Sequence, residues 1–218
     1  MSKQNTSQPT SQPQTSWEVE TTFAVSPETE LPDWLKLAAV HAVGTPQEYT
    51  LRAEYFDTAE LDLSRAHTAL RRRVGGKDAG WHIKRQAQGG REEIHAPLSD
   101  AIPDCILHKL PAQFQDRQAL AKIAQIDNHR TEYLLYDAAG QAIAEFCDDQ
   151  VRTVSYVAEP PHEQQWREWE VEITVAGQAA GLGEAFLTAV ADLCQHKGAQ
   201  HRPDASKLQR TLYGTTTD

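Results

Sequence analysis

The sequence predicts an α+β domain in which antiparallel strands carry most of the structure. The first observation is that apolar and charged residues alternate along many short segments, which is the period of a strand with two different faces. The second is that the glycine pairs Gly75-Gly76 and Gly89-Gly90 separate three such segments, as turns do between neighbouring antiparallel strands. The third is an Ala- and Leu-rich stretch at 178–196, which is typical of a helix.

The polar N-terminal segment sets the first boundary. Residues 1–16 contain only Met, Ser, Lys, Gln, Asn, Thr and Pro. Such a segment cannot bury enough apolar surface to offset the entropy that is lost on ordering. We therefore predict a disordered polar tail over 1–16 and a single domain over 17–214.

The first predicted strand begins at Trp17. Trp17, Val19 and Phe23 share one face of this strand, whereas Glu18 and Glu20 share the other. The apolar face is expected to pack on a core, and the acidic face is expected to be solvated or to meet a cation.

A helix is predicted next, over 27–42. Leu31 and Trp34 begin a helical spacing of apolar residues, Ser26 stands at the N-cap position, and Pro27 stands at the first helical position.

The remaining elements follow from the same two periodicities. Alternation predicts further strands over 48–56, 68–74, 80–86, 91–97, 126–136, 141–157 and 165–175. Helical spacing predicts two short helices within 103–125, for example over 118–125, a long helix over 178–196 and a terminal helix over 206–213. Strands grouped in this way predict an antiparallel meander with helices added to it.

Carboxylates form rows of one sign on the first and last predicted strands. Glu18 and Glu20 share a face of the first strand, and Glu168, Glu170 and Glu172 share a face of the last. Like charges on one strand face repel each other, so these rows are either well solvated or share a cation. For an isolated strand, the solvated face is the simpler alternative.

Basic residues form comparable rows on the strands in between. Arg71 and Arg73 share the polar face of one strand, His82 and Lys84 share that of the next, and Arg91 begins a third. Guanidinium and ammonium groups bind phosphate oxygens. Acidic rows for a metal and basic rows for an anion, carried on one sheet, together predict a site for a metal-bound polyphosphate.

Composition narrows the class of protein. The chain has 218 residues and a formal net charge of −10, which disfavours nucleic acid as a partner. No apolar run is long enough to span a bilayer, and the N-terminus lacks the pattern of a secretory signal, so we expect a cytoplasmic protein with no membrane partner. Cys105, Cys147 and Cys194 are odd in number and far apart, which suits a reducing compartment and structural roles.

The charged motifs and their order resemble those of the CYTH domains, or triphosphate tunnel metalloenzymes, over roughly residues 17–214. That family opens with Glu-x-Glu-x-Lys. Glu18 and Glu20 match its acids, whereas Thr22 stands where the lysine is expected. The further matches, in chain order, are Tyr55-Phe56-Asp57-Thr58, Leu70-Arg71-Arg72-Arg73, Lys84, Arg91 with Glu93, Arg130, Asp148, Glu168-Trp169-Glu170-Val171-Glu172 and Ser206-Lys207.

The resemblance implies an eight-stranded antiparallel β-barrel with helices packed outside and a charged tunnel that holds a triphosphate. It assigns substrate binding to Arg71, Arg73, Lys84, Arg91, Arg130 and Lys207. It assigns metal binding to Glu18, Glu20, Asp148, Glu170 and Glu172, and catalytic roles to Glu18, Glu20, Lys84 and Arg130. Because the proposed ligands are all oxygen atoms, Mg²⁺ or Mn²⁺ is the expected cofactor. Glu168 lies on the same strand face, and its contact with metal is left open.

The resemblance leaves the reaction open. Hydrolysis of inorganic triphosphate or of a small organic triphosphate is the expectation, because no adenine pocket can be located in the sequence. The alternatives are cyclisation, as in a class IV-type adenylyl cyclase, and non-catalytic binding of polyphosphate or nucleotide. Thr22 favours binding without efficient turnover, because threonine lacks the charge and reach of lysine.

Overall fold

The computed structural model of the chain describes residues 12–87, 90–203 and 206–214. Residues 1–11 of the predicted tail lie outside the described residues, as does Gly89 of the second glycine pair. Strand β1 (Gln14–Glu18) begins inside the predicted tail, where Gln14 pairs with His95. The last residues of the predicted tail therefore belong to a strand, because backbone pairing depends little on the polarity of the side chains.

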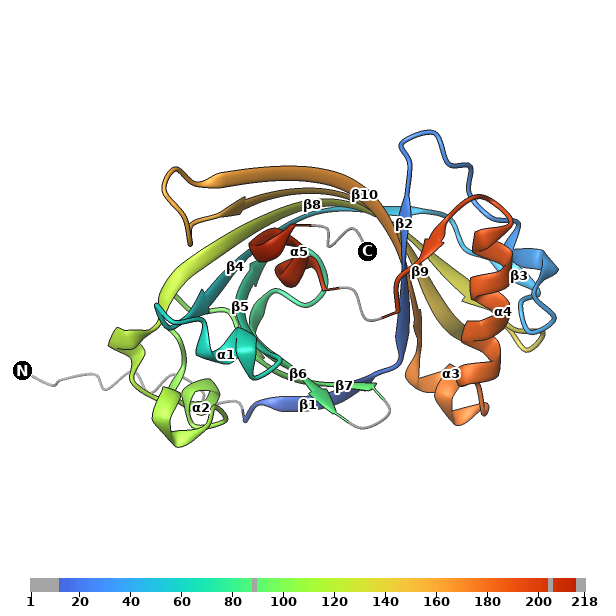
Figure 1. Cartoon of the computed structure of the whole chain (residues 1–218). Helices are drawn as coiled ribbons and strands as arrows, with labels where there is room; N and C mark the ends of the chain where they lie inside the picture. The colour runs from blue at the N-terminus through green and yellow to red at the C-terminus, as the bar shows by residue number, and fades with distance from the viewer. Residues whose placement is uncertain (1–11, 88–89, 204–205, 215–218) are drawn as a thin grey trace, which may run out of the picture.

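A single antiparallel sheet contains all the strands that the structure describes (Figure 1). Its hydrogen-bonded order is β1-β7-β6-β5-β4-β8-β9-β10-β2-β11, and β3 pairs with β8. The other strands are β2 (Glu20–Val25), β3 (Ala42–Val43), β4 (Gln47–Asp57), β5 (Thr68–Val74), β6 (Gly80–Ala87), β7 (Gly90–Pro97), β8 (Ala121–Tyr136), β9 (Ala142–Ser155), β10 (His162–Ile173) and β11 (Gln200–His201).

The sheet closes into a barrel at its N-terminal segment. β1 pairs with β7 and β2 pairs with β10, yet only Val19 separates β1 from β2 along the chain. The same segment thus joins both edges of the sheet, which covers the unpaired backbone groups that an open edge would expose. Counted as one strand together with β4 to β10, it completes eight strands, and the predicted eight-stranded antiparallel barrel is confirmed.

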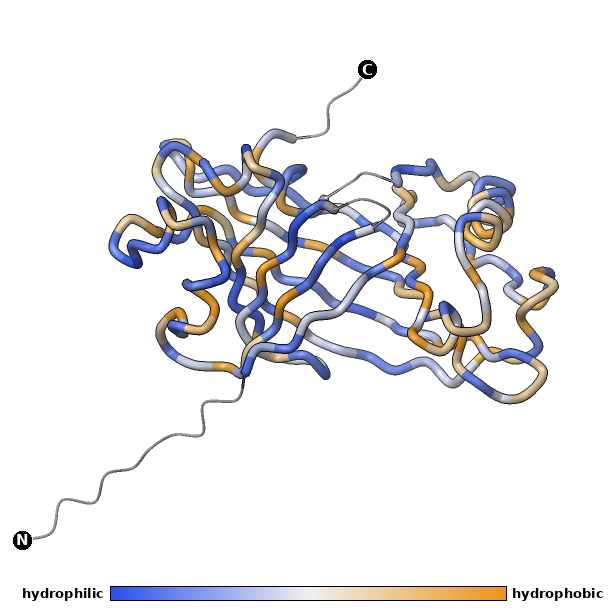
Figure 2. The backbone as a smooth tube through the Cα atoms, turned by 90° about the horizontal axis from the view of Figure 1, so that it is seen from below, coloured by the Kyte–Doolittle hydropathy of each residue, from blue (hydrophilic) through white to orange (hydrophobic). Residues whose placement is uncertain are grey.

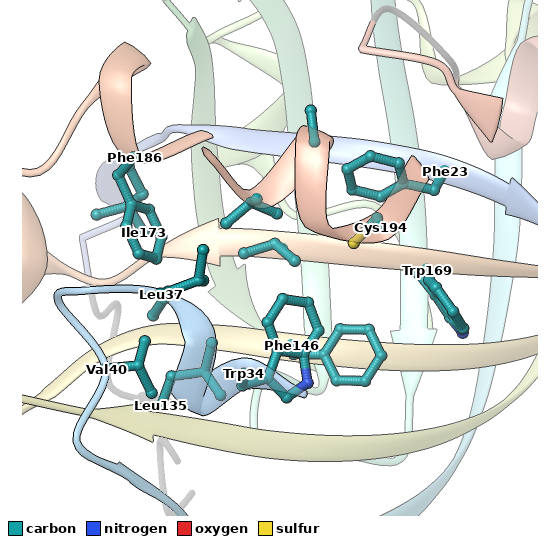
Figure 3. Close-up of a cluster of buried hydrophobic side chains, with 14 of the residues drawn as sticks. Phe23, Trp34, Leu37, Val40, Leu135, Phe146, Trp169, Ile173, Phe186 and Cys194 are labelled. Carbon is teal, nitrogen blue, oxygen red and sulfur yellow. The ribbon is translucent and has the colours of Figure 1, made fainter. Parts of the chain in front are cut away.

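Apolar residues alternate with polar ones along the strands of the barrel (Figure 2). Apolar residues of the strands are buried in clusters with the helices. The largest buried cluster lies at α4 (Glu184–Gln195), where Phe186 and Val190 join Phe146 and Trp169 of β9 and β10 (Figure 3). A second cluster contains Ile83 of β6 together with residues of α2 (Asp104–Leu107). Two further short helices are α1 (Asp62–Arg65) and α3 (Val175–Ala179). Among the helices of the described segments, none combines the length and apolarity that a bilayer crossing requires.

Helix α5 (Lys207–Tyr213) is an exception to the expected outer packing. Leu208 joins a buried cluster with Ile126 and Val151 of β8 and β9, and Ile126 lines the interior of the barrel. Figure 1 shows α5 within the ring of strands. Its N-cap is Ser206, whose hydroxyl accepts the Gln209 N–H. This position brings the first residue of the helix, Lys207, to the interior.

The helix predicted over 27–42 is wrong. The structure has only a short 3₁₀ turn at Trp34–Lys36, although Trp34 and Leu37 are buried. Pro32 lacks a backbone N–H and restricts the residue before it, which disfavours a continuous helix. An irregular segment that covers a core can show the same spacing of apolar residues.

Two other predicted helices differ at their boundaries. The segment 118–125 is a 3₁₀ turn at Arg117–Ala119 followed by β8, because pairing with β4 begins at Ala121. A third 3₁₀ turn lies at Ala112–Phe114. The predicted helix over 178–196 is divided into α3 and α4, since Gly181 between them adopts a φ of 85°.

Candidate functional site

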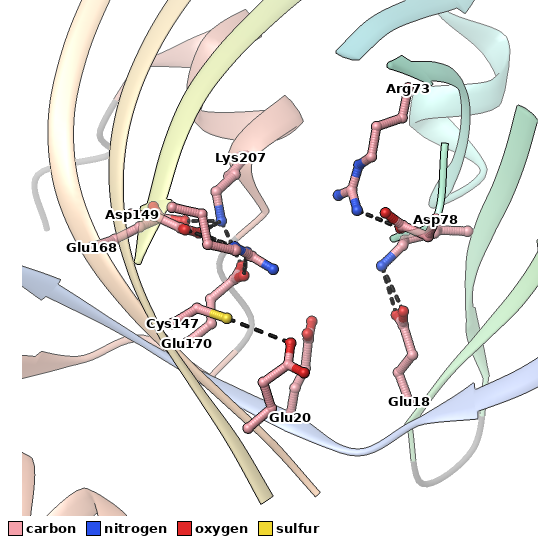
Figure 4. A network of polar contacts seen from close by, with 12 residues as sticks. Glu18, Glu20, Arg73, Asp78, Cys147, Asp149, Glu168, Glu170 and Lys207 are labelled. Carbon is pink, nitrogen blue, oxygen red and sulfur yellow. Dashed lines mark hydrogen bonds and ion pairs between the residues drawn. The ribbon is translucent and has the colours of Figure 1, made fainter. Parts of the chain in front are cut away.

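The inner face of the barrel encloses a cavity of about 640 Å³. Trp169 and Val171 are buried in the outer core, so their neighbours Glu170 and Glu172 face the cavity instead. The predicted site residues that line the cavity are Glu18, Glu20, Arg71, Arg73, Lys84, Arg91, Arg130, Glu170, Glu172 and Lys207. They come from β1, β2, β5, β6, β7, β8, β10 and α5, so elements far apart in the sequence meet at one place (Figure 4).

Asp148 is the predicted site residue that the structure places elsewhere. It pairs across the sheet with Trp169, on the outer face, and its carboxylate accepts two hydrogen bonds of 2.8 Å from Arg167. Arg167 also donates to the backbone carbonyls of the loop that follows β2. Since successive residues of a strand point to opposite faces, the inward acid is the next residue, Asp149. The prediction that Asp148 lies in the site is therefore wrong, and the structure places Asp149 on the inner face of β9 instead.

Lys207 lies among carboxylates on one side of the cavity (Figure 4). Its Nζ is 3.0 Å from Asp149, 2.5 Å from Glu168 and 2.6 Å from Glu170. Arg130 makes a bidentate pair with Asp149, at 2.8 and 2.7 Å, and also donates to Glu170 at 2.5 Å. Asp149 is completely buried. A buried carboxylate is costly unless it is paired, so Arg130 and Lys207 are what permit these acids to be buried.

Burial and pairing act on the pKa values of these acids in opposite directions. For Asp149, burial is outweighed by Arg130 and Lys207, which hold its pKa well below the usual range. For Glu170, burial is outweighed by Lys207 and Arg130, and the pKa falls to about 2. For Glu168, burial prevails and the pKa is raised. One oxygen from each of these acids lies within 4.8 Å of the others, so they are a possible set of metal ligands.

A second charged group lies on the other side of the cavity, around Lys84. Its Nζ donates to both oxygens of Glu18, at 2.7 and 2.8 Å, and lies 3.5 Å from Glu93. Glu93 also accepts from Arg71 at 3.1 Å and contacts His82 at 2.9 Å. Burial raises the pKa of Glu18 to about 7 despite Lys84. For Glu93, burial is outweighed by Lys84, His82 and Arg71, which hold its pKa well below the usual range.

The acidic residues around Glu172 bear on whether the cavity suits a metal ion. No basic side chain among the described residues lies within ion-pair distance of Glu172. Burial and the nearby Glu18 raise its pKa to about 8, with a smaller contribution from Glu20. Its cross-strand partner Glu145 also has a raised pKa, because of burial and Glu132. Glu172 is thus an acid without an ion-pair partner among the described residues, whereas its neighbours Glu18 and Glu145 contact Lys84 and Lys77. Carboxyl oxygens gathered in this way suit a hard divalent cation.

Sequence reasoning missed several charged residues of the cavity. Glu93 stood in a quoted motif without a role, and Glu132 and Glu145 are inward residues of β8 and β9. Alternation could have found Glu132, which lies two positions from Arg130 on the same strand, but not Glu145, which lies three positions from the predicted Asp148. Lys77 and Asp78 belong to a turn, where no periodicity indicates direction. His82, which the sequence placed in a basic row with Lys84, is completely buried and contacts Glu93.

Comparison with known proteins identifies the family. Residues 16–211 match the family described as the CYTH domain. The chain belongs to the CYTH family. Two uncharacterized proteins from strains of Mycobacterium tuberculosis are each 40% identical to it over 211 residues, which is 91% of this chain. The chain spans 40% of the length of these relatives.

Two solved structures share the fold at low sequence identity. A proposed adenylate cyclase of Bacillus halodurans has a TM-score of 0.56 and 20% identity, with 90% of this chain and 97% of that chain covered. A proposed adenylyl cyclase of Hippeastrum, described as having a dominant triphosphatase activity, has a TM-score of 0.51 and 16% identity, with 89% and 94% covered. These structures support the barrel fold of this CYTH domain.

Glutamine at position 172 is expected to stabilise this CYTH domain in the absence of ligand. Because the folded-state pKa of Glu172, about 8, exceeds the ordinary 4.5, the folded protein holds a proton that the unfolded chain releases between these pH values. The contribution of Glu172 to stability therefore falls as pH rises through that window. Glu172→Gln should raise Tm by roughly 5 °C at pH 8 and change it little at pH 4.

Thermal unfolding of both proteins at pH 4, 6 and 8 checks this prediction. Glu163→Gln, at the exposed start of the same strand β10, is the matched control and should show no such trend. A Tm difference for Glu172→Gln that does not depend on pH would contradict the raised pKa.

The structure changes the expectation for Thr22. Thr22 is buried and pairs across the sheet with Glu170, whose carboxylate already accepts from Arg130 and Lys207. A lysine at position 22 would add a further cation to an acid that is already paired, within a packed wall. Thr22→Lys is therefore expected to lower Tm without raising the affinity for tripolyphosphate.

Calorimetric titration with tripolyphosphate and thermal unfolding of the same variant test this expectation. Thr22→Val, which keeps the size of the side chain but adds no charge, is the control for packing. Tighter binding by Thr22→Lys at unchanged Tm would show instead that the missing lysine weakens the site.

Proposed function

We propose that the protein hydrolyses inorganic triphosphate or a small organic triphosphate in this cavity, with Mg²⁺ or Mn²⁺ bound. The observation that carries the proposal is that one cavity of about 640 Å³ contains buried guanidinium and ammonium groups together with a cluster of carboxyl groups, one of which, Glu172, has no ion-pair partner among the described residues. Cations of this kind bind phosphate oxygens, and oxygen ligands of this kind bind hard divalent ions. A metal-bound triphosphate supplies both partners.

The basic side chains would hold the phosphate chain. Arg71, Arg73 and Lys84 line the wall formed by β5 and β6, and Arg130 and Lys207 line the wall formed by β8 and α5. Their charges are fixed by ion pairs before substrate arrives, so little reorganisation is needed as negative charge shifts during phosphoryl transfer. Arg91, which pairs with Glu20, would extend this row toward β1.

The acidic side chains would hold the metal. Glu172, Glu18 and Glu20 form one oxygen-rich group, and Glu170 with Asp149 and Glu168 forms the other. A bound divalent ion supplies charge neutralisation to the phosphates and lowers the pKa of a coordinated water molecule. Glu18 and Glu20 remain in the catalytic set because they face the cavity beside Glu172.

Hydrolysis is favoured over the two alternatives by analogy. The Hippeastrum protein, which shares the fold, is described as having a dominant triphosphatase activity. Cyclisation would in addition require adenine recognition, and binding of phosphate alone would not require a buried acid without an ion-pair partner, such as Glu172.

The test is turnover with defined substrates and metals. We expect phosphate release from tripolyphosphate, thiamine triphosphate or ATP in the presence of Mg²⁺ or Mn²⁺, and none in excess chelator. Glu170→Gln should remove most of this activity, whereas the exposed Glu163→Gln should not. Cyclic AMP formation from ATP would support the cyclase alternative, and tight binding without turnover would support the binding alternative.

A further inference from the structure

The turn between β5 and β6 brings two charged side chains into the cavity. Gly75 and Gly76 have φ angles of 81° and 75°. A Cβ at Gly75 would lie 2.2 Å from the Thr50 carbonyl oxygen, so glycine is needed for the turn to fold against β4. The next two residues, Lys77 and Asp78, line the cavity together with the predicted site residues.

The Asp78 carboxylate forms ion pairs with the guanidinium groups that are expected to bind phosphate. Its Oδ2 is 2.5 Å from Arg73 Nη1 and 3.9 Å from Arg71 Nη2. Both arginines are mostly buried, and the Nε of each is buried without a hydrogen-bond partner. Asp78 is the one described acid within ion-pair distance of Arg73. These guanidinium groups thus keep unused donors, and the Asp78 carboxylate stands where an anionic ligand oxygen would bind.

Lys77 likewise forms ion pairs with two acids of the cavity. Its Nζ forms an ion pair with Glu132 and lies 3.5 Å from Glu145. Glu145 is the cross-strand partner of Glu172, so this ammonium lies at the edge of the acidic group around Glu172, which itself has no ion-pair partner among the described residues. Lys77 therefore supplies positive charge where a metal cation is expected.

These ion pairs can exchange because the turn residues remain solvated. The side chains of Lys77 and Asp78 are 54% and 41% exposed, whereas the Arg71 and Glu132 side chains are 7% and 5% exposed. Half-exposed ion pairs contribute little to the stability of the folded protein. A multiply charged phosphate also offers more hydrogen-bond acceptors to the arginines than one carboxylate does. The backbone of the turn stays anchored, since the Asp78 carbonyl contacts His82 Nε2 at 2.9 Å. Swinging of the two side chains is sufficient for exchange.

We propose that Lys77 and Asp78 set the affinity of the cavity by competing with its ligands. Asp78 competes with phosphate for Arg71 and Arg73, and Lys77 competes with a divalent cation for Glu132 and Glu145. The inference rests on the proposed triphosphate site, which it extends to the turn. Metal and phosphate must then bind strongly enough to displace the ion pairs that Lys77 and Asp78 form inside the cavity.

Two titrations test the inference without turnover. Calorimetric titration with tripolyphosphate, in the absence of metal, should show that Asp78→Asn binds roughly tenfold more tightly than the unmodified protein. The control is Asp127→Asn, which breaks a 2.6 Å pair with Arg52 that lies outside the cavity and should not change the affinity. Asp78→Ser provides a second variant if the asparagine protein does not fold.

Titration with Mn²⁺ alone tests whether Lys77 competes with a divalent cation. Lys77→Met should bind Mn²⁺ more tightly than the unmodified protein. Lys122→Met is the matched control, because Lys122 also pairs with a glutamate and also lies over a tyrosine ring, but does not line the cavity.

The results separate this inference from the proposed function. Equal tripolyphosphate affinity in Asp78→Asn and the unmodified protein, or no binding by either, overturns the role of Asp78. Equal Mn²⁺ affinity in Lys77→Met overturns the role of Lys77. Retained affinity differences without phosphate release from any substrate would reject hydrolysis and leave the competition by the turn intact.

Discussion

Arg130→Lys is expected to lower kcat/KM for the preferred triphosphate by roughly 10²-fold or more. The Arg130 guanidinium holds Asp149 through two hydrogen bonds, at 2.8 and 2.7 Å, while its Nη2 also reaches Glu170. Lysine keeps the charge but lacks the planar fork that can satisfy two acids and still face a phosphate. The loss should therefore come from geometry and not from charge.

Steady-state kinetics with tripolyphosphate, alongside thermal unfolding, measures this effect. Arg52→Lys is the control, since Arg52 also pairs with an aspartate but points away from the cavity. Activity of Arg130→Lys within a few-fold of the unmodified protein would remove Arg130 from the catalytic set.

Asp149→Asn is expected to cause the largest loss of stability, about 3–5 kcal/mol in the free energy of unfolding. Asp149 is completely buried and pairs with both Arg130 and Lys207. Its removal leaves two cations facing each other with less negative charge between them. Urea denaturation at pH 7 measures the loss.

The neighbouring Asp148→Asn is the matched control for Asp149→Asn. It breaks an ion pair with Arg167 on the outer face, where the side chain is less deeply buried, so a smaller loss is expected. A larger loss for Asp148→Asn than for Asp149→Asn would contradict the inward position of Asp149.

The pH dependence of the Asp149 effect follows from the direction of its pKa shift. Arg130 and Lys207 hold the pKa of folded Asp149 below the ordinary 3.8. The stabilisation by its charge is therefore fully present above pH 3.8 and is lost as pH falls toward the folded-state pKa. The stability difference between Asp149→Asn and the unmodified protein should narrow in that acidic range.

Much of the barrel was predictable because alternation is a local property of the chain. Charged and apolar residues that alternate along β5, β6 and β10 indicate two-faced strands whatever lies around them. Such strands bury one face on a core, so the basic and acidic rows had to share the other. The prediction of a helix over 27–42 was wrong because spacing alone was used. The irregular segment that covers the core there has apolar residues at helical spacing.

The local sequence pattern cannot decide whether Asp148 or Asp149 points inward. Adjacent aspartates offer an acid to either face, so a shift of one residue exchanges the inner for the outer position. Only the pairing of Asp148 with Trp169 of β10, in the outer core, decides which acid lies on the inner face beside Arg130 and Lys207.

Alternation along the chain is sufficient to predict two-faced antiparallel strands that carry rows of acids and bases. Which of these charges are paired depends on how the strands assemble. Lys84 and Glu18 are 66 residues apart in the chain yet 2.7 Å apart in space, and α5 brings Lys207 to Glu170 from inside the ring. The turn that carries Lys77 and Asp78 has no periodicity from which its direction could be predicted. The physical reason is that face preference is set by near neighbours in sequence, whereas Coulomb energy depends on distance and burial, which exist only after the barrel closes.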